Sequence, residues 1–534
     1  MNQAHRVSLL SIIICLVISM SSNSLSFAQV FAPGPSDPTL FDNVLNLPTD
    51  PNIDSSFSNP ATIGGFGNTE QVNVLAGGSI GDFASIFTGG EVNINGGSLG
   101  EGVEARSGSE VNINSGVLGG AFLAEIGSMV TVSGGFIGGA FRNNTGANIE
   151  LIGGEYKLNG TAYSNPTITV INSDDVFTGT LADGNSFIFS DAIGSDRLID
   201  VQLTSAALPT LDLSPIVVSS STPSRTLRGG QTLTLLDGGD IPDLHTVDST
   251  LNIEGGSIGS RTNAANSTVN LSSGSTDVLR AHSNSVVNIS GGSIAANLLT
   301  NTGSVVNISD GIVGSDMIFP AIIEDGELNI SGGTTLSPLS SRSSMVNITG
   351  GDVDAFSASL GSVVNVNGGN FHSFSLDLSS EADISGGSFS NRVTVQTEGV
   401  LNVSGGDFDG FVSVGTDSEI NISGGSFDGF FRALFDSEVN LFGSEFLLDD
   451  VLLDNNLTID EAFTISQRDA TLEGLLADGT PFSFDLNSAF GFGFDPNSTL
   501  TVTLVVPEPN SMALLVLGGL SLLARRQKVI ALTK

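Results

Sequence analysis

A short motif of the form Val-Asn-Ile-Ser-Gly-Gly recurs along most of the chain, and its period is the strongest constraint on the fold. Successive copies lie 18 to 20 residues apart, except for one spacing of 22 residues. The leading apolar residues are Val72, Val92, Val111, Val130 and Ile149 in a first array, and Leu251, Val269, Val287, Val306, Leu328, Val346, Val364, Ala382, Leu401, Ile420 and Val439 in a second. One copy is too short to bury its own apolar side, whereas stacked copies bury a continuous core. The period therefore predicts a solenoid of five rungs followed by eleven.

Each repeat is predicted to contain short strands that are separated by bends. In Val364–Val366 the two valines should point inward and Asn365 outward, because side chains alternate along a strand. Gly368–Gly369 should then bend the chain, since a bend needs either a positive φ or a residue without a Cβ atom. Further apolar residues should form a second and a third inward face: Phe371 and Phe374, then Leu376 and Leu378.

These features predict an all-β fold, a parallel β-helix whose rungs stack at ~4.8 Å, so that eleven rungs extend about 50 Å. A left-handed hexapeptide helix would need an aliphatic residue at every sixth position, and Asn370 breaks that rule between Val364 and Leu376. We therefore expect the right-handed form. The repeats resemble those of pectin-lyase-like and autotransporter-passenger β-helices, at the level of the fold only.

A second, longer duplication follows each array. Residues 179–189 match residues 474–484, and both segments are predicted to form a hairpin that turns at an Asp-Gly pair. A final strand should follow each hairpin, at 198–203 and at 500–505. We expect these units to cap the arrays, because an open solenoid end exposes strand edges and apolar core.

The chain is accordingly divided into four parts: a signal peptide at 1–28, a first β-helix module with its C-terminal cap at 29–207, a second such module at 208–505, and a sorting tail at 506–534. Leu45–Leu47 and Leu233–Leu235 are expected to be lead-in segments ahead of the two arrays. The serine-rich segment 219–224 is expected to join the two modules.

Residues 1–28 have the features of a secretory signal peptide, with an apolar run at Val7–Met20 and small residues before a cleavage site after Ala28. Signal peptidase should therefore act as a partner during export, and the mature protein should begin at Gln29. Cys15, the one cysteine of the chain, would leave with this segment, which predicts no disulfide and no cysteine nucleophile. A retained N-terminal anchor is the alternative, although the run is short for a bilayer.

The C-terminus carries three parts in a specific order: Pro507-Glu508-Pro509, the apolar stretch Ser511–Ala524, and Arg525-Arg526. This order resembles the PEP-CTERM sorting tail, which occurs on exported proteins of Gram-negative bacteria that make exopolysaccharide. The resemblance implies recognition by an exosortase, a membrane cysteine protease that cuts near the Pro-Glu-Pro and releases or transfers the protein. About 14 apolar residues rise only ~21 Å as a helix, which suits a transient inner-membrane anchor rather than a full span. A permanent anchor is the alternative, and Val529–Lys534 extends slightly past the usual end of such tails.

Composition excludes several classes of protein. Acidic residues outnumber basic ones 56 to 17, which gives a net charge of −39 and argues against nucleic-acid binding. A hydrophobic content of 40% is too high for a disordered chain. The 67 glycines follow no Gly-X-Y register, which excludes collagen.

The residue after the leading apolar position is asparagine in thirteen of the sixteen rungs, with Thr131, Glu150 and Asp383 as the exceptions. The candidate ligand-binding positions in this column include Asn288, Asn307, Asn365, Asn402 and Asn421. Such a face could hydrogen-bond a repeating polysaccharide. Alternatively, the stacked amides satisfy one another along the axis, as asparagine ladders do in cross-β stacks. Sugar-binding faces usually also carry Trp or Tyr, and here Trp is absent and only two Tyr occur.

A column of polar residues on the next face contains the strongest carboxylate candidates, Asp407, Asp409 and Asp428. Stacking would place these three side chains close together, as paired acid and base or as oxygen ligands for Ca²⁺. A solvated acidic edge is the favoured interpretation, because the spacing matches no catalytic motif and Arg392 and Arg432 are the only basic residues nearby that a lyase could use. Asp449–Asp450 is expected to be a solvated acidic turn, and His245 and His282 are each isolated in the sequence.

The favoured hypothesis is a non-enzymatic exported protein of the cell surface or extracellular matrix, with a structural or adhesive role. Its expected partners are signal peptidase and an exosortase during export, and extracellular polysaccharide afterwards. The first alternative is a secreted polysaccharide lyase or hydrolase that uses Asp407, Asp409 and Asp428. The second is a calcium-dependent adhesin, and apart from this Ca²⁺ no cofactor is expected.

Overall fold

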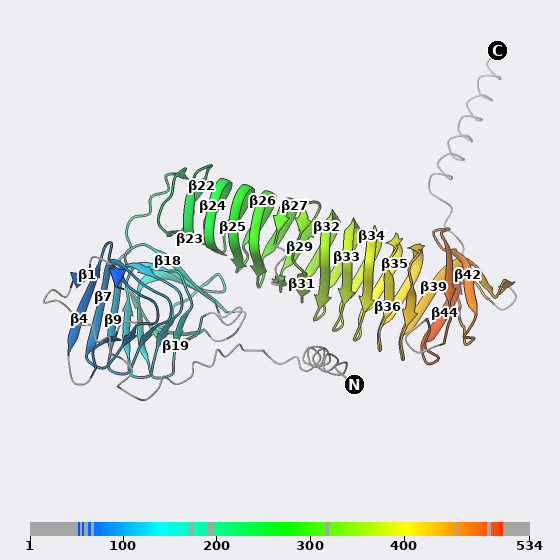
Figure 1. The fold of residues 1–534 in the computed structure, drawn as a ribbon, viewed down its shortest axis with the longest axis horizontal. Helices are drawn as coiled ribbons and strands as arrows, with labels where there is room; N and C mark the ends of the chain where they lie inside the picture. Colours follow the sequence, from blue (N-terminus) through cyan, green and yellow to red (C-terminus); the bar gives the residue numbers. More distant parts are fainter. Residues whose placement is uncertain are drawn as a thin grey trace, which may run out of the picture.

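The structure is a computed structural model that describes residues 52–53, 56–57, 62–65, 69–170, 172, 175–190, 196–314, 320–453, 457–488 and 493–505. These residues are all-β and form a parallel β-solenoid of about 19 turns. Figure 1 shows the strands following one another as a stack of rungs along the molecule. The predicted all-β parallel β-helix is therefore confirmed, and its right hand stays a prediction from the sequence.

The first set of strands, here called the N-terminal stack, pairs into a 14-stranded and a 5-stranded sheet. Its strands are β1 (Asn52–Ile53), β2 (Ser56–Phe57), β3 (Thr62–Ile63), β4 (Glu70–Leu75), β5 (Ser79–Ile80), β6 (Ser85–Ile86), β7 (Gly90–Leu99), β8 (Val103–Ala105), β9 (Glu110–Leu118), β10 (Phe122–Ala124), β11 (Met129–Val132), β12 (Phe136–Ile137), β13 (Phe141–Asn143), β14 (Asn148–Leu158), β15 (Thr161–Ala162), β16 (Thr167–Val170), β17 (Val176–Leu181), β18 (Ser186–Ser190) and β19 (Leu198–Ser205).

The second set, here called the C-terminal stack, pairs into one 25-stranded sheet around its own hydrophobic cluster. Its strands are β20 (Ile216–Val218), β21 (Arg225–Leu227), β22 (Thr232–Leu235), β23 (Asp240–Val247), β24 (Thr250–Ala265), β25 (Thr268–His282), β26 (Val286–Thr300), β27 (Val305–Val313), β28 (Ala321–Glu324), β29 (Glu327–Ile330), β30 (Thr334–Thr335), β31 (Leu339–Arg342), β32 (Met345–Ser359), β33 (Val363–Leu376), β34 (Glu381–Val395), β35 (Val400–Phe408), β36 (Phe411–Val414), β37 (Glu419–Phe427), β38 (Phe431–Ala433), β39 (Glu438–Leu448), β40 (Val451–Leu452), β41 (Ala462–Thr464), β42 (Thr471–Leu476), β43 (Pro481–Asp485) and β44 (Thr499–Leu504). The domain boundaries proposed from the sequence stay predictions.

The repeat register in the structure is the one that the sequence predicts. Each leading apolar residue pairs with its counterpart one rung away; Val346, for example, lies opposite Leu328 on one side and Val364 on the other.

Two expectations about the start of the second array are wrong. Leu233–Leu235 pairs with Leu251–Ile253 and is therefore a rung itself, not a lead-in segment. The segment 219–224 connects β20 to β21 inside the C-terminal stack, because β20 already pairs with β22. Leu45–Leu47 lies outside the described residues.

One rung shows how the sequence produces the coil. Val364 and Val366 are fully buried and Asn365 faces outward. Gly369 has φ +100°, and a Cβ atom on Gly368 would lie 2.7 Å from the carbonyl oxygen of the preceding rung, so both glycines are required. Phe371, Phe374 and Leu376 are buried as predicted. Leu378 is not part of the third inward face: it is 37% exposed and has φ +48° in the turn that follows.

The core of the C-terminal stack contains a column of phenylalanine rings, one from each successive rung. The rings of Phe371, Phe389, Phe408 and Phe427 lie 4.7 to 4.9 Å apart and are within 8° of parallel. Because the register repeats, each ring packs on its equivalent in the next rung, and aromatic contact adds to the burial of apolar surface.

Truncating one ring of this column should therefore destabilise the protein strongly. Phe389→Ala is expected to cost about 3–5 kcal/mol, since it removes a buried ring and leaves a cavity. Phe435→Ala is the control, because Phe435 is 50% exposed and its loss should change stability by no more than about 0.5 kcal/mol. Urea unfolding followed by circular dichroism measures both, and equal midpoints for the two variants would contradict the column.

The two stacks end in the same arrangement of strands, whereas the predicted division into two capped modules stays a prediction. In each, an antiparallel hairpin (β17–β18 and β42–β43) lies on the last long strand, and a final strand (β19 and β44) pairs with that strand in parallel. The aspartates of the two turns make the same contact. Asp183 accepts a hydrogen bond from the Gly135 amide at 2.6 Å, and Asp478 accepts one from the Gly425 amide at 3.0 Å. Each hairpin is thereby fixed to the glycine bend of an earlier rung.

The cap of the N-terminal stack packs against the first rungs of the C-terminal stack, and β18 lies beside β23 (Figure 1). Lys157 Nζ lies 2.7 Å from an Asp248 carboxylate oxygen across this contact. An apolar cluster also spans it: Val176, Ile188, Val247 and Ala265. The ring of Phe136 lies over that of buried His245, with 4.6 Å between the centroids.

Two buried histidines should make the fold sensitive to acid. Burial lowers the pKa of His245 to about 3 and that of His282 to about 4, with nearby arginine charges acting in the same direction. Both rings are therefore neutral in the fold, whereas the unfolded chain protonates them below about pH 6.5. Stability is fully present above about pH 6.5 and is lost as the pH falls towards 4, because the unfolded state binds more protons.

The variant His245→Gln/His282→Gln should show a flatter dependence of stability on pH. Between pH 6.5 and 4 the slope should decrease by up to about 1.4 kcal/mol per pH unit for each histidine removed. Carboxylate titration is common to both proteins and cancels in the comparison. Identical slopes for the wild type and the variant in thermal melts would contradict the assignment.

Candidate functional site

The asparagines of the repeated motif form a hydrogen-bonded ladder on the outside of the solenoid. From Asn270 to Asn365, each side-chain amide donates to the amide oxygen of the preceding rung at 2.9 Å. Asn421 and Asn440 continue the pattern at 2.9 and 3.0 Å. Of the candidate positions, Asn288, Asn307, Asn365, Asn402 and Asn421 all donate within this column, Asn402 to Asp383 at 2.8 Å. The amides are thus used along the axis, as the structural alternative expects, and the ladder rigidifies the rod.

Asp383 is a break in this ladder. It accepts a hydrogen bond from Asn402, but a carboxylate has no N–H to donate to Asn365, its partner in the preceding rung. Asp383→Asn should therefore complete the ladder and stabilise the protein by about 0.5–1.5 kcal/mol. Asp354→Asn is the matched control, because it removes the same charge from an exposed position outside the ladder. Equal gains in urea unfolding for both variants would show that charge alone is responsible.

The carboxylate column is exposed along one edge of the C-terminal stack. Asp407 lies in register with Ser388 and Ser426, whereas Asp409 and Asp428 each follow one of two stacked phenylalanines and are equivalent positions one rung apart. None of the three occurs in the ion pairs of the described residues. The described part of the chain also contains no group of three or more His, Cys, Asp or Glu side chains arranged to hold a metal ion.

Asp428 also lines a cavity that the sequence did not suggest. The cavity has a volume of about 530 Å³ and lies between the last rungs and the cap hairpin β42–β43. Glu445 and Glu473 contribute two further carboxylates to its lining. The duplicated cap, which the sequence indicated only as a closing unit, therefore also shapes an acidic recess.

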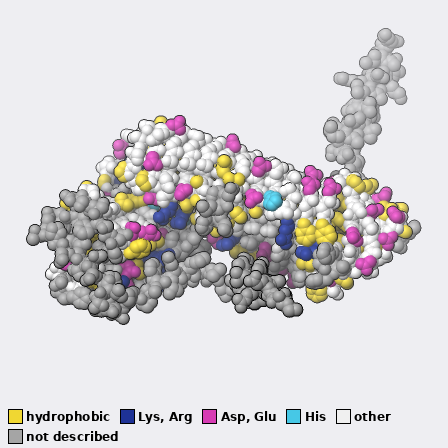
Figure 2. Space-filling model, in the orientation of Figure 1, with side chains coloured by type: hydrophobic (Ala, Val, Ile, Leu, Met, Phe, Trp, Pro, Cys, Tyr) yellow, Lys and Arg dark blue, Asp and Glu magenta, His cyan; other side chains and the backbone are white. Residues whose placement is uncertain are grey.

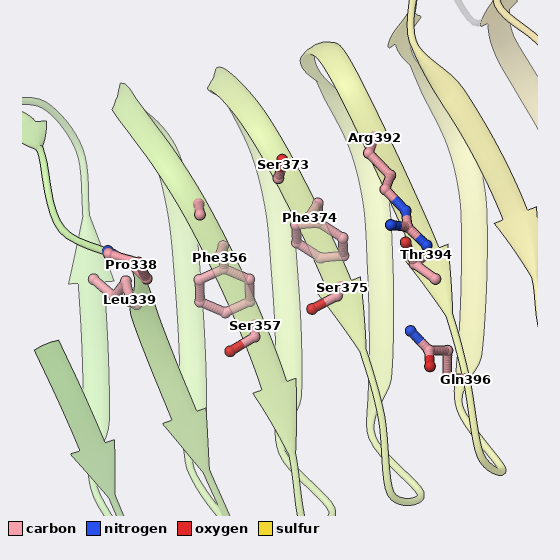
Figure 3. A pocket seen from close by; sticks show the side chains of 11 residues that line it. Pro338, Leu339, Phe356, Ser357, Ser373, Phe374, Ser375, Arg392, Thr394 and Gln396 are labelled. Atoms are coloured by element: carbon pink, nitrogen blue, oxygen red, sulfur yellow. The ribbon is translucent and has the colours of Figure 1, made fainter. Parts of the chain in front are cut away.

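A second cavity runs across the rungs on another side of the same stack (Figure 3). We call it the hydroxyl groove. It has a volume of about 330 Å³ and is lined by Pro338, Leu339, Ala355, Phe356, Ser357, Ser373, Phe374, Ser375, Arg392, Thr394 and Gln396. Arg392 is its one charged lining residue. Figure 3 shows the Arg392 side chain extending towards Thr394, with Phe356 and Phe374 side by side on neighbouring strands. Their rings are 2% and 1% exposed, so the groove presents hydroxyls and a guanidinium rather than aromatic faces.

Beyond Arg392, the same column of the sheet becomes aromatic. Ala355, Ser373, Arg392 and Phe411 occupy one register position in successive rungs. The ring of Phe411 then stacks on that of Phe430, with 5.5 Å between the centroids and 8° between the planes. We call this pair of rings the aromatic ledge. Within it, Phe430 is 44% exposed.

Arg432 is held against the ledge. Its guanidinium carbon lies 4.9 Å from the centroid of Phe411, and two of its nitrogens donate to the Ser413 hydroxyl at 3.0 and 3.2 Å. Burial, and next the positive charge of Arg392, lower the pKa of Arg432. The guanidinium remains charged, because arginine does not deprotonate in proteins. On the face drawn in Figure 2, hydrophobic and basic side chains gather together towards the C-terminal end of the stack.

Sequence reasoning missed this surface because it searched for Trp and Tyr. The signal was present in the repeat: Arg392, Phe411 and Phe430 are spaced by 19 residues, which is one rung each.

The structure also shows where two other groups of residues from the sequence analysis lie. Asp449–Asp450 forms a turn with positive φ at both residues, and the Asp449 carboxylate accepts hydrogen bonds from Thr471 and Gln467. His245 and His282 are not isolated in space, since they bond to Asn263 and Asn301 respectively.

The predicted signal peptide, and the sorting residues Pro507, Glu508, Pro509, Arg525 and Arg526, lie outside the described residues. In the part that the structure describes, no helix has the length and apolar character needed to cross a membrane.

Comparison with known protein families identifies the tail. The PEP-CTERM protein-sorting motif matches residues 505–528, which confirms the resemblance drawn from the sequence and leaves Val529–Lys534 beyond the match. The match implies export with a C-terminal sorting tail and processing by an exosortase. No curated protein and no solved structure matches the chain.

Proposed function

We propose that this chain is an exported structural protein of the cell surface or extracellular matrix, and that its side walls contact extracellular polymer. The main observation in support of this proposal is that the sorting motif begins where the last strand of the fold ends. The last strand, β44, ends at Leu504 and the motif begins at residue 505. The amide of Val505 still donates to the Gly443 carbonyl oxygen at 2.8 Å. A cut near Pro507–Pro509 therefore releases a rod whose cap is complete.

The interior of the rod supports a structural role. The clusters of buried apolar side chains run from Ile63 to Val201 and from Val218 to Val502. Each rung packs on the next, and the asparagine ladder adds polar bonds along the same axis. A stack of this kind has few independently moving parts, because every rung is constrained by two neighbours. Such a rod suits a spacer or scaffold outside the cell.

Processing through the tail can be tested in a host that has an exosortase. Glu508→Ala should leave the unprocessed chain in the membrane fraction, whereas the wild type should leave the membrane as a shorter product. Glu461→Ala is the control, since Glu461 is an exposed glutamate in the cap and outside the motif. Immunoblots of membrane, surface and matrix fractions measure the outcome. Identical processing of the wild type and Glu508→Ala would contradict the role of the motif, and absence of the product from surface and matrix would contradict the proposed location.

The two alternatives are separated from the structural role by activity and by calcium. If the chain is structural, acidic and neutral polysaccharides should give no new reducing ends and no unsaturated uronate absorbance. Turnover that is lost in Asp409→Ala and in Asp428→Ala would instead make it a lyase or hydrolase. A calcium-dependent rise in melting temperature, abolished by chelator, would favour the adhesin.

A further inference from the structure

The basic side chains of the central rungs are confined to one side of the rod. Residues 320–453, all of which are described, contain three arginines and no lysine: Arg342, Arg392 and Arg432. All three point outward from one sheet of the solenoid, at the outward positions of β31, β34 and β38. We call this sheet surface the arginine face. In a chain with a net charge of −39, this segregation places the positive charges of the central rungs on one face, with Glu324 in register beside Arg342.

The charges of Arg342, Arg392 and Arg432 are not neutralised by ion pairs among the described residues. None of the three arginines occurs in an ion pair of the described residues, in contrast to Lys157 and Arg228, which pair across the contact between the stacks. Arg392 is exposed at the junction of the hydroxyl groove and the aromatic ledge. An exposed guanidinium presents N–H donors in a planar fork that matches a carboxylate, so it is suited to an anionic ligand.

The groove and the ledge together have the chemistry of a saccharide-binding surface. Ser357 and Ser375 supply partly exposed hydroxyls and Gln396 an exposed amide beside Arg392, and Thr394, which is 5% exposed, also lines the groove. On the other side, Phe430 is 44% exposed where it stacks on Phe411, so that the ledge offers apolar aromatic surface against which the C–H groups of a sugar ring can pack. Both lie along the rod axis, and successive rungs repeat at ~4.8 Å, so that an extended polymer meets one set of groups after another.

We propose that the arginine face binds a segment of carboxylate-bearing polysaccharide, a polyuronate, with a uronate carboxylate on Arg392 and neighbouring sugar rings in the hydroxyl groove and on the aromatic ledge. The inference rests on the proposed function in one respect, namely that the rod meets extracellular polymer. Net repulsion between an acidic rod and an acidic polymer is screened beyond about 8–10 Å at physiological ionic strength. The positions of the arginines therefore determine where the polymer contacts the rod. A neutral polysaccharide would leave Arg392 without a counter-charge.

Direct binding tests the proposal. Isothermal titration calorimetry with alginate hexasaccharide as the polyuronate and maltohexaose as the neutral probe should show binding of the former only. Chelator is present throughout, so that no divalent cation bridges two carboxylates. Arg392→Gln should weaken alginate binding at least tenfold. Phe430→Ser should weaken it severalfold by removing half of the ledge. Both residues are exposed, and unchanged melting temperatures verify that the variants fold.

Arg225→Gln is the matched control, because it removes the same charge from β21, at the far end of the C-terminal stack, and should leave the affinity unchanged. The proposal is overturned if the wild type does not bind alginate, if Arg392→Gln binds as well as the wild type, or if Arg225→Gln loses as much affinity. Equal binding of maltohexaose would also overturn it. Retention of the chain in the matrix fraction without alginate binding would reject this site and leave the proposed function standing.

Discussion

The fold depends on the exact superposition of equivalent residues from one rung to the next. Each leading apolar residue covers its equivalent in the preceding rung and is covered by the one in the next, and the asparagines of the ladder donate to the asparagine of the preceding rung, except at Asp383, which accepts from Asn402. A slip of one residue would turn every apolar side chain outward, since the side-chain period of a strand is two. Register is therefore enforced by the core and by the ladder together. A glycine with positive φ recurs at these bends, and where a second glycine precedes it, as at Gly291 and Gly368, a Cβ atom would strike the carbonyl oxygen of the preceding rung.

The same superposition builds the surface. A residue type that recurs once per rung forms a continuous stripe of side chains on the surface of the solenoid. Small changes in sequence therefore determine which side chains each wall of the solenoid exposes. A column that reads alanine, serine, arginine, phenylalanine and phenylalanine in successive rungs produces a groove, a charge and an aromatic ledge in a line. The caps protect the ends of both stacks with the same device, an aspartate in a hairpin turn that holds the glycine bend of an earlier rung. The sorting motif follows the second cap without an intervening segment.

Much of this could be predicted from the sequence because the determinants are local and repeated. The rung positions, the inward valines, the glycine bends, the two hairpins and the sorting tail all follow from period, turn residues and motif order. What could not be predicted depends on exceptions to the repeat. Leu233–Leu235 lacks the asparagine of the motif, and its Gly238-Gly239 pair lies one residue later than in the other rungs, so that its role as a rung was hidden. Leu378 is apolar but falls in a turn with positive φ. The proposed binding surface was missed for two reasons. Its aromatic residues are phenylalanines rather than Trp or Tyr. In addition, the burial of neighbouring rings and the path of the groove depend on side chains from several rungs.

Rung-by-rung register is the central claim, and engineered disulfides test it most directly. Ser340, Ser357 and Ser375 occupy one outward column in three successive rungs that also borders the hydroxyl groove. In a chain whose Cys15 is replaced by serine, the pair Ser357→Cys/Ser375→Cys should form a disulfide on mild oxidation, because neighbouring strands lie about 4.8 Å apart. The pair Ser340→Cys/Ser375→Cys spans two rungs, about 10 Å, and should remain reduced. Mass spectrometry of the oxidised proteins distinguishes the two results. Absence of a disulfide in the first pair, or equal oxidation of both pairs, would contradict the register on which the fold and the binding surface depend.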